Sequence, residues 1–273
     1  MLGPPVMASR LQPELSSVLE DVRRAAPARG RRGSRAFVAE GQRLLERAWR
    51  AGWLPREVLL GDGAELDPLA REAEARGAHA RRVPEVLLLE LAEGRRSGLV
   101  TALFDVPQPL SVDELVAATD PSSVFLVLVD VDEPGNVGAL IRTALASGAA
   151  GAICAGSTDP FHPKAVRTSL GSSFKLPLAF SSGEALLAAL RQNGIVSLAA
   201  VARQGEPIDR AAWPRGRVAL CVGNEAHGLP DGVRAEADVR VSIDLSLEAD
   251  SFSVNAAAAV CLYEIQRRAR FEG

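Results

Sequence analysis

Three polar stretches, each next to an apolar run, carry side chains suited to binding or catalysis. The first holds Asn136 and, six residues later, Arg142; the second is Gly223-Asn224-Glu225; the third opens at Ser251. An arginine that is even half-buried needs an anionic partner. A glutamate accepts hydrogen bonds from backbone or ligand donors. These residue types predict a polar ligand-binding site.

The same residues also have purely structural interpretations. Asn136 is placed to cap a helix, Arg142 can be a structural arginine, and Ser251 and Ser253 are ordinary cap residues near a helix start. A lone loop histidine such as His227 is more typical of a solvated turn than of a catalytic base. The stretches contain neither Gly-x-Gly-x-x-Gly nor a phosphate loop ending in Gly-Lys-Ser/Thr, which argues against a nucleotide-dependent enzyme. Spacing alone leaves the structural and functional interpretations open.

Strands must position these stretches, and the apolar runs indicate where the strands lie. Val124–Asp130 is almost continuously apolar, as expected of a strand buried on both faces. Further strands are predicted at Ala152–Ala155, Leu176–Phe180, Ile195–Val201, Val218–Val222 and Val239–Ile243, and helices at Val137–Ser147, His162–Leu170, Glu184–Gln192, Pro230–Ala237 and Ser251–Ala269. This alternation predicts an α/β fold with a parallel sheet, in which ligands bind outside the carboxyl ends of strands.

The N-terminal part predicts a second, smaller α/β domain. Phe37 falls on one helical stripe with Leu44, Leu45, Ala48 and Trp49, so a helix is expected from Phe37 to a stop at Gly52. Strands are predicted at Val58–Leu60, His79–Val83 and Leu99–Phe104, and helices at Glu65–Arg76 and Pro84–Leu91. The predicted organisation is a mobile or loosely helical basic arm over residues 1–35, a domain over 36–107, a linker over 108–120 and a domain over 121–273.

Composition excludes several classes of protein. Hydrophobic residues make up 47% of the 273 residues and charged residues 24%, which is enough for a core and excludes wholesale disorder. The apolar runs are far shorter than the ~20 residues that span a membrane, and no secretory signal opens the chain. Three scattered cysteines predict neither a disulfide framework nor a metal site. A reduced, cytoplasmic protein is therefore expected.

Charge is unevenly distributed along the chain. The net charge is −3, yet nine arginines lie between Arg23 and Arg50. A concentrated basic segment on an acidic protein is a candidate phosphate-binding surface. Its candidate contact residues are Arg29, Arg31, Arg32 and Arg35. The alternative is a compositional bias, since 29 of the 31 basic residues are arginine.

The order of the polar motifs resembles one enzyme family. Asn136…Arg142, Gly223-Asn224-Glu225 and Ile243…Ser251…Glu264 resemble the SpoU (TrmH-like) class of SPOUT RNA 2′-O-ribose methyltransferases, over about residues 121–268. Residues 36–107 resemble the substrate-binding domain related to the ribosomal protein L30e fold that many members carry.

The resemblance implies transfer of a methyl group from S-adenosyl-L-methionine to a ribose 2′-hydroxyl. Because L30e-like domains bind RNA loops, 23S ribosomal RNA is the favoured substrate, with an antibiotic-resistance methylation as one such role. The alternatives are a tRNA 2′-O-methyltransferase and a catalytically impaired SPOUT-fold RNA-binding protein. The resemblance further implies a deep trefoil knot, rare among folds, and a homodimer with its active site assembled across the interface. No membrane and no metal are expected.

The resemblance also assigns roles to residues of this chain. Arg142 takes the place of the family's candidate base, or orients a phosphate and polarises the hydroxyl. Asn136 and Glu225 would position Arg142 and the ribose, and Ser251 would complete the site. The implied cofactor-binding residues are Val222, Gly223, Ile243, Leu245, Phe252 and Ser253.

The third motif departs from the family pattern. The usual string Ser-Leu-Asn-Val-Ser reads Ser251-Phe-Ser-Val-Asn255 here, so Ser253 replaces the family's asparagine. Asn255 stands two positions later, and two positions along a helix lie on different faces. Asp244 stands where proline is usual, and Ala226 where glycine is frequent. These changes affect the expected cofactor contacts and RNA target more than the expected fold.

Overall fold

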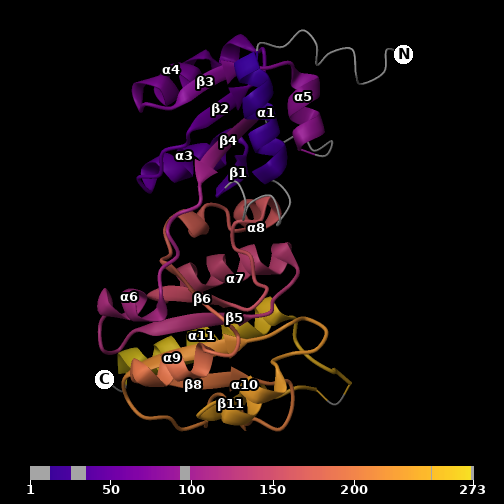
Figure 1. The fold of residues 1–273 in the computed structure, drawn as a ribbon. Coiled ribbons are helices and arrows are strands. Elements are labelled where there is room, and N and C mark those ends of the chain that lie inside the picture. The colour runs from indigo at the N-terminus through magenta and orange to yellow at the C-terminus, as the bar shows by residue number, and fades with distance from the viewer. Residues whose placement is uncertain (1–12, 26–34, 93–98, 247, 272–273) are drawn as a thin grey trace. The chain divides into compact units, whose positions relative to one another are not determined.

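The computed structural model describes residues 13–25, 35–92, 99–246 and 248–271 (Figure 1). It divides into two compact units. Unit 1 is Met1–Pro107 with Phe161–Arg167, and unit 2 is Gln108–Pro160 with Thr168–Gly273. The excursion into unit 1 contains most of helix α8 (Pro163–Thr168). Among the described residues, no helix is both long and apolar enough to cross a membrane.

Unit 1 is built on a four-stranded mixed sheet in the order β1-β4-β2-β3. Its strands are β1 (Ala36–Glu40), β2 (Glu57–Leu60), β3 (His79–Arg82) and β4 (Val100–Asp105), and its helices are α1 (Pro13–Ala25), α3 (Gln42–Arg50), the short 3₁₀ helix η2 (Ala64–Leu66), α4 (Asp67–Ala75) and α5 (Glu85–Leu91). β4 is antiparallel to both of its neighbours, whereas β2 and β3 are parallel. The α/β class predicted for this part is confirmed.

The segment around Phe37 is a strand, so the helix predicted from that residue is wrong in its first turn. All five residues of β1 are buried, and the Phe37 ring stacks on Phe104 of β4 at 5.3 Å between centroids. Gly41, at φ 97°, then turns the chain into α3. A short apolar run before an amphipathic helix fits the residue spacing of a helix as well as that of a strand. Its pairing with β4 makes it a strand.

Helix α1 differs from the loose arm expected over residues 1–35. Val18, Leu19 and Val22 are buried and pack in one cluster with strand residues Leu59 and Leu103. Over Pro13–Ala25 the chain is therefore a regular helix that completes the core of unit 1. Residues 1–12 and 26–34 lie outside the described part of the chain.

Unit 2 contains a seven-stranded sheet in the order β7-β6-β5-β10-β8-β11-β9, with every paired neighbour parallel. Its strands are β5 (Val124–Val129), β6 (Gly151–Ala155), β7 (Leu178–Ser181), β8 (Ile195–Ala200), β9 (Glu206–Pro207), β10 (Arg217–Val222) and β11 (Val239–Ser242). All six residues of β5 are buried, as its apolar run predicts. The parallel α/β fold predicted for this part is confirmed.

Helices cover both faces of this sheet (Figure 1). They are α6 (Val112–Ala117), α7 (Pro134–Ser147), the 3₁₀ helix η3 (Ser172–Phe174), α9 (Leu186–Gln192), α10 (Asp231–Glu236) and α11 (Val254–Phe271). α6, α9 and α10 share one hydrophobic cluster with side chains from the central strands. α7 and α11 pack on each other against the same sheet. This layer places the starts of α7 and α11 beside the strand ends.

The linker predicted over residues 108–120 contains helix α6. Ser111 and Glu114 form a reciprocal capping box at its start, and Val112, Leu115 and Val116 are buried. Serine followed three residues later by glutamate is a sequence signal for a helix start. Two nearby prolines obscure it, and the correct assignment is a helix of unit 2.

Candidate functional site

The strand order of unit 2 reverses between β5 and β10, and the loops after these two strands meet there. The chain proceeds from β5 outward to β6 and β7, while β10 pairs with β8 on its other side. Asn224, just after β10, donates from Nδ2 to the Asp130 carbonyl oxygen at 3.1 Å and to Asp132 Oδ2 at 3.0 Å. Such a reversal point is where open α/β sheets bind ligands.

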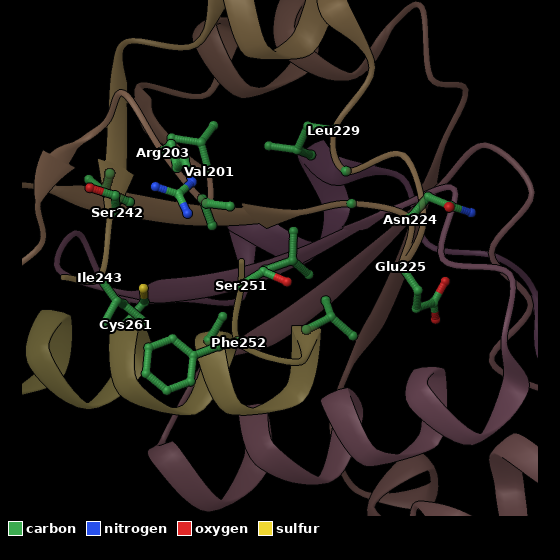
Figure 2. Close-up of a pocket in the computed structure, with 18 of the residues that line it drawn as sticks. Val201, Arg203, Asn224, Glu225, Leu229, Ser242, Ile243, Ser251, Phe252 and Cys261 are labelled. Carbon is green, nitrogen blue, oxygen red and sulfur yellow. The ribbon is translucent and has the colours of Figure 1, made fainter. Parts of the chain in front are cut away.

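A cavity of ≈ 880 Å³ opens at this edge of the sheet. Its walls come from the loops after β8, β10 and β11 and from the start of α11 (Figure 2). Nine sequence-predicted site residues line it: Asn136, Val222, Gly223, Glu225, Ile243, Leu245, Ser251, Phe252 and Ser253. The volume suits a ligand of nucleoside size or larger. Figure 2 shows Asn224 and Glu225 at one end, with Ser242, Ile243 and Cys261 at the other.

The loop after β10 closes tightly on itself. Asn224 and Gly228 exchange two backbone hydrogen bonds of 3.0 and 2.8 Å, and Asn224 Oδ1 accepts from the backbone N–H groups of Ala226 and His227. A Cβ on Gly223 would lie 2.3 Å from the Gly228 carbonyl carbon, so only glycine fits. His227 is exposed in this turn. The loop fixes Glu225 at the mouth of the cavity.

Asn136 links the three predicted stretches. Its Nδ2 donates to Glu225 Oε1 at 2.7 Å, and its Oδ1 accepts from Asn255 Nδ2 at 2.7 Å. Asn136 does not cap α7, because the N-cap is Glu133, whose side chain accepts from the Gly135 backbone N–H at 3.1 Å. The capping interpretation of Asn136 is therefore wrong, and its amide serves the site.

Arg142 is not brought to the cavity of its own chain. It lies on α7 with an exposed side chain, and it is not among the lining residues. Six residues on a helix correspond to about 240° of rotation, so Asn136 and Arg142 face different directions. No ion pair of Arg142 occurs among the described residues, so the interpretation as a satisfied structural arginine gains no support.

The stretch before α11 is open. Ser251 and Ser253 are exposed, and Phe252 is 45% exposed beside the cavity. Ser253 Oγ accepts from the Ala256 backbone N–H at 3.3 Å, which makes it the cap of α11. The capping role predicted for Ser253 is thus present, whereas Ser251 keeps its hydroxyl on the cavity wall.

Sequence reasoning missed one wall of the cavity. Residues 200–204, after β8, line it, with Val201 and Arg203 visible in Figure 2. Arg203 Nη2 donates to the Ala249 carbonyl oxygen at 3.1 Å, and Ser242 Oγ donates to the Gly205 carbonyl oxygen at 2.9 Å. The available signal was positional, because this loop also follows a buried parallel strand.

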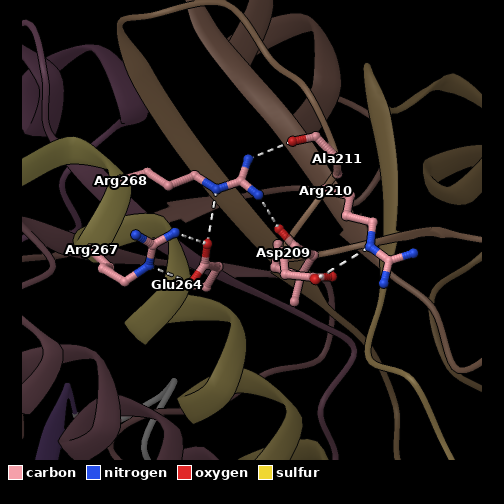
Figure 3. A network of polar contacts seen from close by, with 7 residues as sticks. Asp209, Arg210, Ala211, Glu264, Arg267 and Arg268 are labelled. Atoms are coloured by element: carbon pink, nitrogen blue, oxygen red, sulfur yellow. Dashed lines mark hydrogen bonds and ion pairs between the residues drawn. The ribbon is translucent and has the colours of Figure 1, made fainter. Parts of the chain in front are cut away.

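An ion-pair network lies on α11 and reaches the segment after β9 (Figure 3). Glu264 accepts from Arg267 and from Arg268 Nε, the latter at 2.9 Å. The Arg267 hydrogen bond, with that of Arg268, lowers the pKa of Glu264 to about 2. Arg268 also donates to the carbonyl oxygens of Ile208 and Ala211 and lies over the Trp213 ring at 4.6 Å. The network ties the segment after β9 to α11.

Cys261 lines the cavity without being a candidate nucleophile. It is 1% exposed, and burial raises the pKa of its thiol to about 12. Cys154 and Cys221 are buried free thiols as well.

The candidate phosphate contacts of unit 1 are only partly described. Arg29, Arg31 and Arg32 lie outside the described residues, and Arg35 is exposed just before β1. Two other arginines of the basic segment are neutralised on α1: Arg23 pairs with Glu90 at 3.3 Å and Arg24 with Glu20 at 3.0 Å. These two arginines therefore each have a carboxylate partner within unit 1.

Comparison with known proteins places this site in a family. The family model described as the SpoU rRNA Methylase family matches residues 123–263. A 23S rRNA (uridine(2479)-2′-O)-methyltransferase from Streptomyces viridochromogenes is 33% identical over 85% of this chain and 83% of its own. The 23S rRNA (guanosine(2553)-2′-O)-methyltransferase RlmP of Bacillus subtilis is 26% identical over 84% of this chain and 88% of its own.

Solved structures agree with the sequence relatives. The AdoMet-bound rRNA methyltransferase from Sinorhizobium meliloti superposes with a TM-score of 0.82 at 27% identity, over 94% of this chain and 97% of that one. The two-unit fold with its parallel sheet is therefore one that solved rRNA methyltransferase structures share. The chain belongs to the SpoU rRNA methylase family.

Proposed function

We propose that this protein is an S-adenosyl-L-methionine-dependent RNA 2′-O-ribose methyltransferase that acts on 23S ribosomal RNA. The observation that carries the proposal is the cavity at the carboxyl ends of β8, β10 and β11, which Asn136, Glu225 and Ser251 line and where Asn136 is hydrogen-bonded to Glu225. Relatives that share more than four-fifths of their length with this chain are named as 23S rRNA 2′-O-methyltransferases.

The cavity suits the cofactor in size and in chemistry. The tight loop at Gly223 and the chain at Ile243 and Leu245 offer backbone groups, while the exposed Phe252 ring offers an apolar surface for an adenine. Val222 and Ser253 complete the wall. When bound, S-adenosyl-L-methionine supplies an activated methyl group.

The chain's own residues would hold the ribose and its hydroxyl proton. Glu225 Oε1 is engaged by Asn136, which leaves the second carboxylate oxygen to accept from a ribose hydroxyl or from a guanidinium. Ser251 offers a hydroxyl on the same wall. Arg142 orients an RNA phosphate and polarises the hydroxyl, with water or another group taking the proton. Holding the groups in place accounts for most of the expected rate enhancement.

Arg142 requires a second copy of the chain in this scheme. It is exposed on α7 and absent from the cavity of its own protomer. On α11, which packs on α7, Val260 and Tyr263 are also exposed, at 42% and 70%. A homodimer that brings Arg142 of one protomer to the cavity of its partner would complete the site. The trefoil knot and the L30e-like nature of residues 36–107, with Arg29, Arg31, Arg32 and Arg35 as RNA contacts, belong to the same proposal. It involves no metal.

The test offers the purified chain radiolabelled S-adenosyl-L-methionine together with unmodified 23S rRNA, 16S rRNA or tRNA. Label in 23S rRNA alone, mapped to a ribose 2′-O-methyl group, is the expected result. Cofactor binding without transfer to any RNA would contradict the proposal and favour an RNA-binding protein. Label confined to tRNA would contradict the assignment of 23S rRNA as the substrate.

The Arg142→Ala variant tests the catalytic assignment. We expect transfer to fall by about 100- to 1000-fold, the order seen when a charge-stabilising catalytic group is lost. The dissociation constant for S-adenosyl-L-methionine, measured by calorimetry, should stay unchanged because Arg142 does not line the cavity. Retained turnover would remove Arg142 from the mechanism. Mixing Arg142→Ala with Glu225→Ala protomers should restore transfer if the site spans two chains.

A further inference from the structure

We propose that Asn255 is a positioning residue for this reaction: it orients the side-chain amide of Asn136 and, through it, the carboxylate of Glu225. The inference rests on the methyl transfer proposed above. Asn255 lies in the first turn of α11, Asn136 in the first turn of α7 and Glu225 in the loop after β10. Two hydrogen bonds of 2.7 Å connect the three side chains in series.

The direction of each hydrogen bond follows from the chemistry of Glu225. An ionised carboxylate only accepts, so Asn136 must offer it the NH₂ end of its amide. Asn136 Oδ1 then points away from Glu225 and needs a donor of its own. Asn255 Nδ2 is that donor, at 2.7 Å. Without it, the Asn136 amide is free to turn over and present an oxygen to the carboxylate, which would repel Glu225.

An asparagine at position 255 lowers the stability of the fold, which a residue kept only for structure would not do. Its Oδ1 is buried, and no described residue donates to it. A buried acceptor without a partner destabilises the folded state. A small apolar residue at this position would avoid that cost, so the contact with Asn136 is the reason we infer for an asparagine here.

In the third motif, serine and asparagine stand at positions 253 and 255 in the reverse of the family's order, and the two residues have different roles in this structure. Ser253 caps α11 through its hydroxyl, whereas Asn255 reaches the first motif. Asn255 is not among the residues that line the cavity, although Val254 and Ala257 are. Asn255 therefore acts on the ligand only through Asn136 and Glu225.

The experiment compares kcat, cofactor affinity and melting temperature in full-length Asn255→Ala and Asn255→Asp. The aspartate is nearly isosteric but, when ionised, cannot donate to Asn136. Both variants should lower kcat by about 10- to 100-fold, the order expected for a misplaced catalytic group. The dissociation constant for S-adenosyl-L-methionine should stay within about twofold, and the melting temperature of Asn255→Ala should not fall. Unchanged kcat in both variants, or an activity loss that only tracks a lower melting temperature, would overturn the proposal.

The matched control is Gln266→Ala. Gln266 also joins α11 to α7, by donating from Nε2 to the Gly148 carbonyl oxygen at 3.0 Å, but it lies far along the helix from Asn255. This variant should keep the wild-type kcat. A double variant, Asn136→Ala with Asn255→Ala, should be no slower than the slower single variant, because both act through one contact. Additive losses would contradict the series arrangement.

A second readout separates failure of this inference from failure of the proposed function. The side-chain NH₂ resonances of Asn136, assigned by their loss in Asn136→Ala, should shift in Asn255→Ala and stay unmoved in Gln266→Ala. Unmoved resonances in Asn255→Ala would refute the contact itself. A shift in a protein whose wild type methylates no RNA would leave the contact standing and refute the reaction.

Discussion

Two walls of the cavity are built in opposite ways. The wall after β10, Val222–Leu229, has paired backbone bonds between Asn224 and Gly228 and a side chain that bonds back into its own turn. The wall before α11, Ile243–Ser253, has exposed side chains at Asp244, Ser251 and Phe252 and few internal bonds in its described residues. The first wall holds the Glu225 carboxylate, which we propose to act in the reaction, in a preset place. The second leaves room for a ligand to order it.

This contrast separates two tasks of the site. Positioning for chemistry benefits from groups fixed before the substrate arrives. Admission and release of a cofactor require a segment that opens, and such segments come from the less stable parts of a fold. Placing the two tasks on different strand ends would let one wall stay fixed while the less internally bonded wall adjusts to a ligand.

The largest effect is expected from Gly223→Ala in the rigid wall. The added Cβ would lie 2.3 Å from the Gly228 carbonyl carbon and 2.4 Å from its oxygen, so the backbone must shift. Forced overpacking costs about 1–3 kcal/mol, and the shift would displace Glu225. Thermal unfolding and calorimetry should show a lower melting temperature and no measurable cofactor binding. Gly232→Ala, where a Cβ meets nothing within 4 Å, is the control. Wild-type binding by Gly223→Ala would show that this wall is not rigid.

The sequence predicted the strands of unit 2 and the residues at their ends better than it predicted the connections. Val124–Val129 is a strand because its apolar run is short, rich in β-branched valine and without a polar face, as in strands buried on both faces. Phe37, by contrast, fits a helical stripe and a strand equally, and only the pairing of its segment with β4 makes that segment a strand. Ser111 begins a helix that the flanking prolines obscure. Local pattern identifies a long apolar run as buried, and it leaves ambiguous the type of element formed by a short apolar run that adjoins an amphipathic helix.

The sequence predicted which residues form the site, but it did not predict the hydrogen bonds between them. Glu225 and Asn136 follow from the motifs, but the donor at Asn255 is 119 residues from Asn136. No spacing rule connects two residues so far apart in the chain. The different direction of Arg142 follows once α7 is known to include both residues, because six helical residues rotate its side chain about 240° from that of Asn136.

A smaller effect is expected from Glu264→Gln, in the ion-pair network of α11. The pKa of Glu264 lies at about 2, below the ordinary 4.5, because Arg267 and Arg268 stabilise its charge. This stability is present above pH 4.5 and lost as the pH falls towards 2. The variant should lose about 1–3 kcal/mol at pH 7, and its difference from wild type in urea unfolding should shrink below pH 4.5. Glu72→Gln, in an exposed pair with Arg76, should cost under about 0.5 kcal/mol. A pH-independent difference would contradict the charge argument.

The smallest effect on stability is expected from Phe252→Ala in the open wall. The ring is 45% exposed, so its removal should cost under about 1 kcal/mol of folding free energy. If the ring instead covers bound S-adenosyl-L-methionine, the dissociation constant should rise about tenfold, which corresponds to about 1.4 kcal/mol. Phe252→Leu keeps an apolar surface and should retain most of the affinity. Equal losses for Ala and Leu would point to a specific aromatic contact, and no loss for either would mean that the open wall closes without Phe252. Because 45% of Phe252 is exposed before the ligand arrives, a cofactor-dependent gain in its protection from solvent would show that the ring is part of the binding surface.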